Sequence, residues 1–412
     1  MGTAEPTAQA EMPGDTPQGA RDAKKRQPPR RAIVARVVLG LLFVLGAYLA
    51  ATPLGRANVR AAMLLPALIT LRQPAPLVTT GDQVRHTTME IPGEAGPVYL
   101  DIYAPTGPPP PIPGEREGVV IIPGVGDNRT VDQLVNLSSS LARAGLVVVN
   151  MTTDSLIAYD LAPSDADAVV RAVLAAQHLP GVGHERVGIL GFSAGGALAC
   201  FAAADPRIHD SLAFITLFGG YFDAETLLGE YGSRGYVADG QFNHWVPNPV
   251  PLAVFANAIA DGLPSDEAAT LRGAFPLEGV NPLPPEQIAQ LSPPGAAAYH
   301  LLAGDQPDAV PANLAALSPQ MHALLANLSP RTIVAKVQAP IYLLHDRNDE
   351  FIPYTQSRTF DAELTRLSHP HTYAEFGIFA HVEVKSGVGG GQLLRDAATL
   401  FWLLSQMLLP GS

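Results

Sequence analysis

The residues that could carry chemistry begin with a serine set between glycines. Residues 191–195 read Gly-Phe-Ser-Ala-Gly, which fits the pattern G-x-S-x-G. The pattern follows a β-rich run at 187–190 and precedes small residues typical of a helix. A strand, a sharp turn and a helix in this order expose the hydroxyl of Ser193, which makes it a candidate nucleophile. The alternative is a glycine-rich turn in which Ser193 only caps the helix.

A serine hydroxyl needs a general base and an acid that orients the base. Asp349 lies in the loop after the apolar run 340–345, and His381 follows the β-rich run 372–376. The chain order serine, aspartate, histidine is that of one hydrolase arrangement. We therefore predict Ser193 as nucleophile, His381 as general base and Asp349 as the orienting acid.

Two other histidines compete for the role of the base. His369 and His371 lie beside the run 372–376, but both precede it. Catalytic groups of parallel sheets gather at the carboxyl ends of strands, which favours His381.

Strand and helix patterns alternate around these residues. Strand patterns lie at 84–91, 97–103, 118–122, 146–150, 186–192, 212–218, 340–345 and 372–376. Helix patterns lie at 131–144, 165–179, 194–204, 355–367 and 392–409. This alternation predicts an α/β fold, in which an antiparallel pair is followed by a mostly parallel sheet with helices on both faces.

The alternation stops at residues 220–334, which we call the insertion. It contains fourteen prolines and short helix patterns, and structureless stretches of this length are uncommon unless they are functional. We predict a lid over the site. Its aromatic residues either line a substrate pocket or form the lid's own core: Tyr221, Phe222, Tyr231, Tyr236, Phe242, Trp245, Phe255, Phe275 and Tyr299.

Residues 84–409 resemble the α/β-hydrolase superfamily, and most of all its dienelactone-hydrolase and prolyl-oligopeptidase-like branches. Family members often show His-Gly-x-x-Asp-x-x-Val-Pro around the acid. Residues 345–353 are similar, with Asp346 in place of the glycine and Ile352 in place of the valine. The resemblance favours Asp349 over Asp346 as the acid. The dienelactone hydrolases use cysteine as nucleophile, so their substrate does not carry over to Ser193.

The oxyanion hole is expected from two backbone amides. The amide of Ala194, at the start of the helix after Ser193, would face the developing oxyanion. The resemblance implies a second amide from the loop after the first parallel strand, which assigns Val125 by position. The family's histidine is absent from this loop, which reads Pro-Gly-Val-Gly at 123–126. Gly191 and Gly195 keep side chains away from the sharp turn at Ser193, residues 191–195, which we call the elbow.

Composition excludes several other classes of function. The net charge is −12, and residues 1–36 hold seven Lys/Arg and four Asp/Glu, so the remainder carries −15. Phosphate backbones would repel this body, which excludes nucleic acid as a partner. One cysteine, Cys200, allows neither an intrachain disulfide nor a cysteine-based zinc site. No spacing suits a metal site or a phosphate loop, so no cofactor is expected.

The first residues predict membrane attachment. Residues 1–31 have the composition of a disordered tail that ends in a basic cluster. Residues 32–54 are apolar enough to cross a bilayer of about 30 Å as a signal-anchor helix. Basic flanks stay in the cytoplasm, so the catalytic part would lie on the extracytoplasmic side. The alternative is a signal peptide cleaved near Ala51. Residues 55–83 are expected as a juxtamembrane stalk, with packing against the catalytic domain as the alternative.

Together these features predict a membrane-anchored serine hydrolase that cleaves carboxylic esters through an acyl-enzyme. The catalytic domain would comprise 84–219 and 335–412, with a small-molecule or lipid-like ester as substrate. A peptidase or an acyltransferase is the alternative among enzymes. A binding protein that keeps the fold without catalysis is the alternative from another class.

Overall fold

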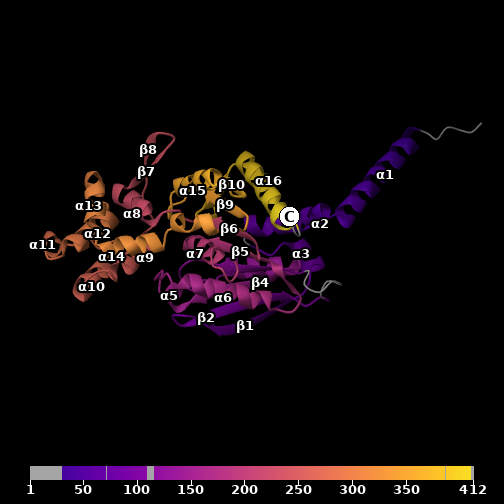
Figure 1. Ribbon diagram of the computed structural model, residues 1–412. Coiled ribbons are helices and arrows are strands. Elements are labelled where there is room, and N and C mark those ends of the chain that lie inside the picture. The colour runs from indigo at the N-terminus through magenta and orange to yellow at the C-terminus, as the bar shows by residue number, and fades with distance from the viewer. Residues whose placement is uncertain (1–29, 71, 109–115, 386, 410–412) are drawn as a thin grey trace, which may run out of the picture. The chain divides into compact units, whose positions relative to one another are not determined.

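The computed structural model describes residues 30–70, 72–108, 116–385 and 387–409. The chain divides into two compact units, Met1–Ala51 and Thr52–Ser412, and each is described by itself (Figure 1). Of the predicted tail at 1–31, residues 1–29 lie outside the described residues, and residues 30–31 belong to the first helix.

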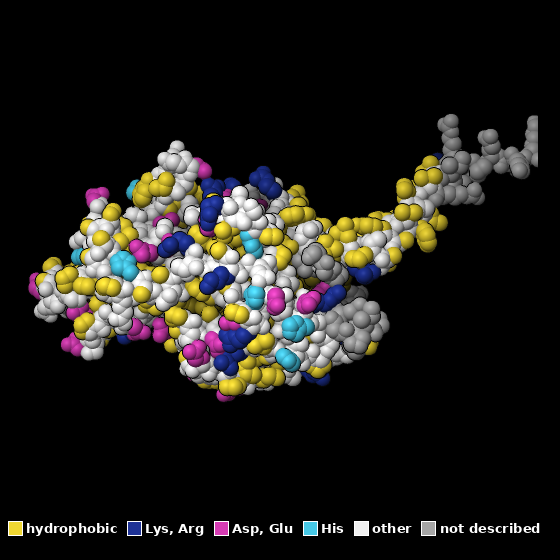
Figure 2. All heavy atoms as spheres, in the orientation of Figure 1, with side chains coloured by type: hydrophobic (Ala, Val, Ile, Leu, Met, Phe, Trp, Pro, Cys, Tyr) yellow, Lys and Arg dark blue, Asp and Glu magenta, His cyan; other side chains and the backbone are white. Residues whose placement is uncertain are grey.

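The described part of the first unit is the helix α1 (Arg30–Ala51). Its large apolar side chains are exposed from Val37 to Leu45, and Figure 2 shows hydrophobic side chains along its visible side. The predicted span 32–54 is interrupted at Thr52, because a new helix starts at Pro53, and proline lacks the N–H that would continue the first one.

The lengths and apolar character of α1 and of the helix that follows it bear on the predicted membrane span. Within the described ranges, no single helix is long and apolar enough to cross a bilayer alone. Val37–Ala51 and Pro53–Thr70 meet the requirement only when they are counted together across their break.

The second unit is built on an eight-stranded sheet of order β1-β2-β4-β3-β5-β6-β9-β10. Its strands are β1 (Val84–Pro92), β2 (Pro97–Pro105), β3 (Arg116–Ile122), β4 (Val147–Thr153), β5 (Val182–Phe192), β6 (Leu212–Phe218), β9 (Ile341–Asp346) and β10 (His371–Phe376). β1 and β2 are antiparallel, and every pair from β4 to β10 is parallel, as predicted. The carboxyl ends of the parallel strands therefore meet at one edge.

Helices cover both faces of the sheet (Figure 1). One face packs against α6 (Asp165–Gln177), α7 (Ala194–Ala203) and α15 (Thr355–Arg366). The other packs against α2 (Pro53–Thr70), α3 (Ala75–Thr80), α4 (Asp132–Arg143) and α16 (Gly390–Met407). Short elements are α5 (Asp154–Ile157), β11 (Phe379–Ala380) and β12 (Glu383–Val384).

The residues interpreted as a stalk contribute to this packing. Ala57, Ala61 and Leu64 of α2 are buried, and α2 lies against α4 and α16. The spacing of small and apolar residues along α2 creates the buried stripe.

The insertion folds mostly into helices. Its elements are α8 (Ala224–Ser233), the hairpin β7 (Gly235–Ala238) and β8 (Gln241–His244), α9 (Pro249–Ala260), α10 (Ser265–Ala274), α11 (Pro285–Ile288), α12 (Pro293–Ala303), α13 (Val310–Ala316) and α14 (Pro319–Asn327). Prolines stand in the first turn of α9, α11, α12, α13 and α14, where a missing N–H costs nothing. The proline-rich composition thus produces many short helices, with a core continuous with that of the sheet.

Candidate active site

Ser193 occupies a strained turn between β5 and α7. Its backbone angles are φ 54° and ψ −128°, a region that residues with a side chain rarely adopt. A Cβ on Gly191 would lie 2.7 Å from the carbonyl carbon of Gly195 and 2.8 Å from Cα of Gly196. A Cβ on Gly195 would lie 2.5 Å from the carbonyl oxygen of Ile122. Both glycines are therefore required by backbone contacts, as the pattern predicts.

His381 and Asp349 form a buried pair. His381 Nδ1 lies 2.7 Å from Asp349 Oδ2, and the side chains are almost inaccessible to solvent. Asp349 Oδ1 accepts hydrogen bonds from the amides of Phe351 (2.7 Å) and Ile352 (3.0 Å). The carboxylate fixes the ring through Nδ1–H, which leaves Nε2 available to accept a proton.

The pKa of Asp349 is set by opposing effects. Burial alone would raise it, but the charge that His381 can carry and hydrogen bonds from His345 and His381 lower the pKa of Asp349 well below its usual range. The acid is therefore ionised at neutral pH and can stabilise a protonated His381.

Ser193 and His381 line the same cavity, of about 430 Å³. In the described part of the chain, no hydrogen bond joins Ser193 Oγ to the His381 ring. Catalytic hydrogen bonds often tighten only when substrate is bound. His381 itself has a positive φ of 59° and stacks on Phe351, with ring centroids 4.4 Å apart.

Asp346, the other candidate acid, has a different role. Its carboxylate accepts hydrogen bonds from the amides of Asn348 (2.8 Å) and Phe379 (2.6 Å). Burial raises the pKa of Asp346 despite these bonds. Asp346 thus ties the loop after β9 to the loop that leads to His381, and Asp349 is the carboxylate that contacts the imidazole.

A second histidine, His345, supports the acid and was not predicted as a site residue. It is fully buried, and its Nε2 lies 3.3 Å from Asp349 Oδ2 and 3.0 Å from the carbonyl oxygen of Ile352. Both neighbours are acceptors, so the hydrogen-bond network assigns the proton to Nε2. Nδ1 then accepts from the hydroxyl of Ser357 at 2.7 Å. The only signal in the sequence was the first position of the motif around Asp349.

The insertion holds the acid loop, residues 347–353, through three successive carbonyl groups. Trp245 Nε1 donates to the oxygen of Asp349 (3.1 Å), the amide of Asn248 to that of Glu350 (2.7 Å), and the Tyr231 hydroxyl to that of Phe351 (2.9 Å). Buried Trp and Tyr normally find such partners, but no spacing in the sequence identifies which.

Glu230 lies next to these contacts on α8. Its carboxyl group accepts hydrogen bonds from Gln356 Nε2 (2.8 Å) and the Thr355 hydroxyl (3.2 Å) at the start of α15. Burial raises the pKa of Glu230 to about 7, although these two hydrogen bonds and His345 oppose the shift. A titratable group is thus built into the junction between insertion and acid loop.

Val125 and Ala194, the two expected oxyanion amides, both line the cavity. Within the described ranges, neither amide donates to another group of the chain. The loop of Val125 is held by its carbonyl oxygen, which accepts from Asn128 Nδ2 at 2.8 Å. The geometry leaves both N–H groups available to an oxyanion.

Apolar side chains form most of the cavity wall. Three of the insertion's predicted aromatics line it, namely Tyr221, Tyr231 and Phe255, whereas Phe275 and Tyr299 pack in the insertion's own core. Phe242 is half exposed on the hairpin. Some of the predicted aromatic residues therefore line the cavity, and others form the insertion's own core. No group of three or more His, Cys, Asp or Glu in the described residues could hold a metal ion.

The sheet, the elbow and the order of the three residues make this fold α/β-hydrolase-like. No protein-family model matches the chain, and no curated protein is significantly similar to it. Among solved structures, an acylaminoacyl peptidase of Pyrococcus horikoshii is similar with a TM-score of 0.46 and 14% identity, over 81% of this chain and 43% of that one.

Two further solved structures are similar at the same level. Dipeptidyl peptidase 4 of Porphyromonas gingivalis has a TM-score of 0.43 and 13% identity, over 78% of this chain and 35% of that one. A 2,6-dihydroxy-pseudo-oxynicotine hydrolase has a TM-score of 0.46 and 15% identity, over 82% and 71%. The chain spans less than half the length of the two peptidases. Similarity at this level does not indicate the substrate, so the function is argued from the geometry of the site itself.

Proposed function

We propose that the protein is a serine hydrolase that cleaves carboxylic esters through an acyl-enzyme. The observation that carries the proposal is the strained Ser193 in one cavity with a histidine whose Nδ1 is fixed by a buried carboxylate at 2.7 Å. Such a pair supplies the base that a serine hydroxyl needs.

The residues perform the reaction in two halves. His381 Nε2 takes the hydroxyl proton as Ser193 Oγ attacks the ester carbonyl carbon, and the amides of Val125 and Ala194 stabilise the oxyanion. The carbon–oxygen bond of the ester then breaks, and His381 returns the proton to the departing alcohol. Water attacks the acyl-enzyme with its proton going to His381, and Ser193 leaves with that proton as the acid is released. Asp349 stabilises the imidazolium in both halves.

The cavity lining favours an ester over a peptide. Within the described chain, the lining contains no Asp, Glu, Lys or Arg that could pair with a charged peptide terminus. An uncharged ester needs no such partner, and the mostly apolar walls suit its acyl and alkyl groups.

The test is labelling and turnover by the full chain in lipid nanodiscs. We expect a fluorophosphonate probe to label wild type, and short p-nitrophenyl esters to be hydrolysed, with both lost in Ser193→Ala. The matched control is Ser265→Ala, at an exposed position of α10, which should keep both. Labelling without turnover of any ester would favour a peptidase. A folded chain that neither labels nor turns over ester would be a binding protein.

We also propose that α1 anchors the protein in a membrane with the catalytic part outside the cytoplasm. The exposed apolar side chains of α1 and the basic residues before it support this placement. We expect the chain to resist extraction by alkaline carbonate, and Leu41→Glu with Val44→Glu to release it. A soluble mature form beginning after Ala51 would instead establish a cleaved signal peptide.

A further inference from the structure

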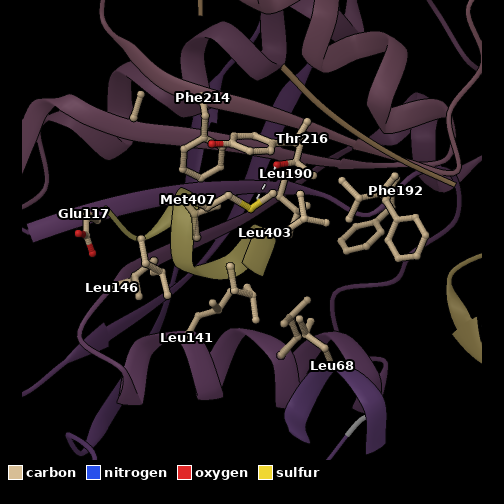
Figure 3. A pocket seen from close by; sticks show the side chains of 18 of the residues that line it. Leu68, Glu117, Leu141, Leu146, Leu190, Phe192, Phe214, Thr216, Leu403 and Met407 are labelled. Atoms are coloured by element: carbon tan, nitrogen blue, oxygen red, sulfur yellow. Dashed lines mark hydrogen bonds between the residues drawn. The ribbon is translucent and has the colours of Figure 1, made fainter. Parts of the chain in front are cut away.

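A second, larger cavity lies away from Ser193, on the sheet face covered by α2, α4 and α16. Its volume is about 700 Å³, within the range of roughly 300–1,000 Å³ typical of small-molecule sites. Figure 3 shows its apolar lining, with strand residues on one side and residues of α4 and α16 facing them. We call it the α4–α16 cavity. Six of its lining residues are Leu190, Phe214, Tyr342, Leu141, Leu403 and Met407.

The cavity leaves the central strands incompletely covered on this face. Parallel strands are normally buried on both faces. Side chains on the α7 side of β5, β6 and β9 are fully buried, namely Ile189, Ile215 and Leu343. On the other side, Leu190, Phe214 and Tyr342 are only partly buried, whereas Thr216, Phe218 and Leu344 are buried. Part of the apolar strand surface on this face therefore lacks a packing partner.

The α4–α16 cavity adjoins the catalytic cavity. The two have three lining residues in common, Pro123, Asn128 and Val382. Pro123 and Asn128 flank the loop of the Val125 amide, and Val382 follows His381 in the chain. The α4–α16 cavity thus begins beside the loop of the Val125 amide and the residue that follows His381.

The cavity extends along the sheet away from this junction. It is lined from Ser211, just before β6, to Phe218 at the end of that strand. The seven residues of β6 span roughly 20 Å at about 3.3 Å per residue. Charged side chains of both signs line the far end, where the strands begin, namely Glu117, Glu185, Arg186 and Asp210. At the end next to the catalytic cavity, the shared lining residues are apolar except for Asn128.

We propose that the α4–α16 cavity binds the hydrocarbon part of a long acyl chain whose ester carbonyl lies at Ser193. The proposal rests on the proposed ester hydrolysis and narrows its substrates to long-chain acyl esters. An acyl chain matches this lining, because it brings apolar surface to partly buried Leu, Phe and Met side chains and needs no hydrogen bond.

The first test compares chain lengths. For the full chain in nanodiscs, kcat/KM on p-nitrophenyl esters from acetate to palmitate should rise by up to about fourfold per added methylene while the chain fits, from the free energy of burying one CH₂. Met407→Trp places a larger ring in the cavity and should lower the palmitate-to-acetate ratio at least tenfold. The matched control is Met89→Trp, on the edge strand β1 where Met89 is 42% exposed, and its ratio should equal that of wild type. Leu404→Trp on the same wall replaces Met407→Trp if that variant fails to fold.

The second test does not require catalysis. Ser193→Ala should bind 11-(dansylamino)undecanoic acid, and palmitate should displace it, whereas Ser193→Ala with Met407→Trp should bind it at least tenfold more weakly. Equal ratios and equal probe binding with and without Met407→Trp would overturn the proposal. So would a dimer that Met407→Trp dissociates, because a second copy would then cover the cavity.

The two proposals can fail separately. Turnover of short esters without any rise along the series, together with no probe binding, would leave the hydrolase and remove the acyl site. Probe binding that depends on Met407 without turnover of any ester would leave the acyl site and remove the hydrolase.

Discussion

Two members of the candidate triad, Ser193 and Asp349, are held in place by different physical means. Ser193 is fixed by glycine backbones packed against other backbone atoms, at separations that leave no room for a methyl group. Asp349 is fixed by hydrogen bonds to its own loop, to His345 and, through the carbonyl groups of the acid loop, to the insertion. The nucleophile thus depends on close packing, and the acid depends on directional polar contacts.

This difference determines how each part should respond to change. Interiors packed backbone against backbone relax little, so a methyl group at the elbow should affect folding itself. A hydrogen bond contributes about 1 kcal/mol net, so removing one from the acid loop should shift the position of the acid while the fold persists. Glu230 lies at the contact between the insertion and the acid loop, so a change of pH should alter the stability of this contact.

The largest effect is expected from Asp349→Asn, which removes the negative charge that contacts His381. The amide would favour the wrong tautomer of His381 and could not stabilise the imidazolium, so kcat/KM on a short ester should fall about 10⁴-fold. Steady-state kinetics measure this loss, with urea unfolding as a check of the fold. Asp346→Asn is the matched control, because Asp346 contacts backbone amides and not His381. A loss in Asp349→Asn no larger than that in Asp346→Asn would contradict the role of Asp349 as the acid.

The next largest effect is expected from a methyl group added at the closely packed turn around Ser193. Gly191→Ala should lower the free energy of unfolding by at least about 3 kcal/mol, because the new methyl group meets the backbone of Gly195 and Gly196. Gly273→Ala on α10, where a Cβ would have no neighbour within 4 Å, should instead stabilise by about 0.5–1 kcal/mol. Urea denaturation measures both. Equal stability of the two variants would mean that the elbow is not close-packed.

The same comparison explains what the sequence could predict. The elbow depends on residues next to one another, so the pattern at 191–195 and its strand and helix context were sufficient to predict it. The order of Ser193, Asp349 and His381 followed from strand ends, and the structure brings these residues together. The contacts of Trp245 and Tyr231 join residues more than a hundred positions apart, and no local pattern encodes them.

Two further features were missed by the sequence predictions. The predicted helix 32–54 ends at Ala51, because Pro53 begins α2 and favours a new first turn over continuation. The α4–α16 cavity depends on how far apart two helices lie over the sheet, which periodicity does not report. Local signals thus predicted the turn around Ser193 and the contact between His381 and Asp349 better than the surroundings that position them.

A smaller effect should appear as a dependence of stability on pH. The pKa of Glu230 is raised to about 7 in the folded state, so between its ordinary value and pH 7 the folded state binds more protons than the unfolded state. The free energy of unfolding therefore falls as pH rises through this window, by up to about 3 kcal/mol. Glu230→Gln removes the titration, so urea unfolding should show the variant gaining on wild type between pH 5 and pH 8. Glu286→Gln, at an exposed position of α11, is the control. A constant difference between Glu230→Gln and wild type at all pH values would contradict the shift.

The smallest effect concerns one hydrogen bond to the acid loop. Tyr231→Phe removes the hydroxyl that donates to the Phe351 carbonyl, at a cost of about 1–3 kcal/mol of stability. Because the loop carrying Asp349 loses a restraint, kcat should also fall about fivefold with little change in KM.

Tyr299→Phe separates positioning from stability. The Tyr299 hydroxyl is also buried in the insertion, but it accepts from the amide of Leu283 at 3.0 Å, away from the acid loop. Tyr299→Phe should lose about as much stability as Tyr231→Phe and keep the wild-type kcat. If both variants reduced kcat equally, the insertion would act on catalysis only through general stability. If only Tyr231→Phe did so, the insertion would position the acid through direct contact with its loop.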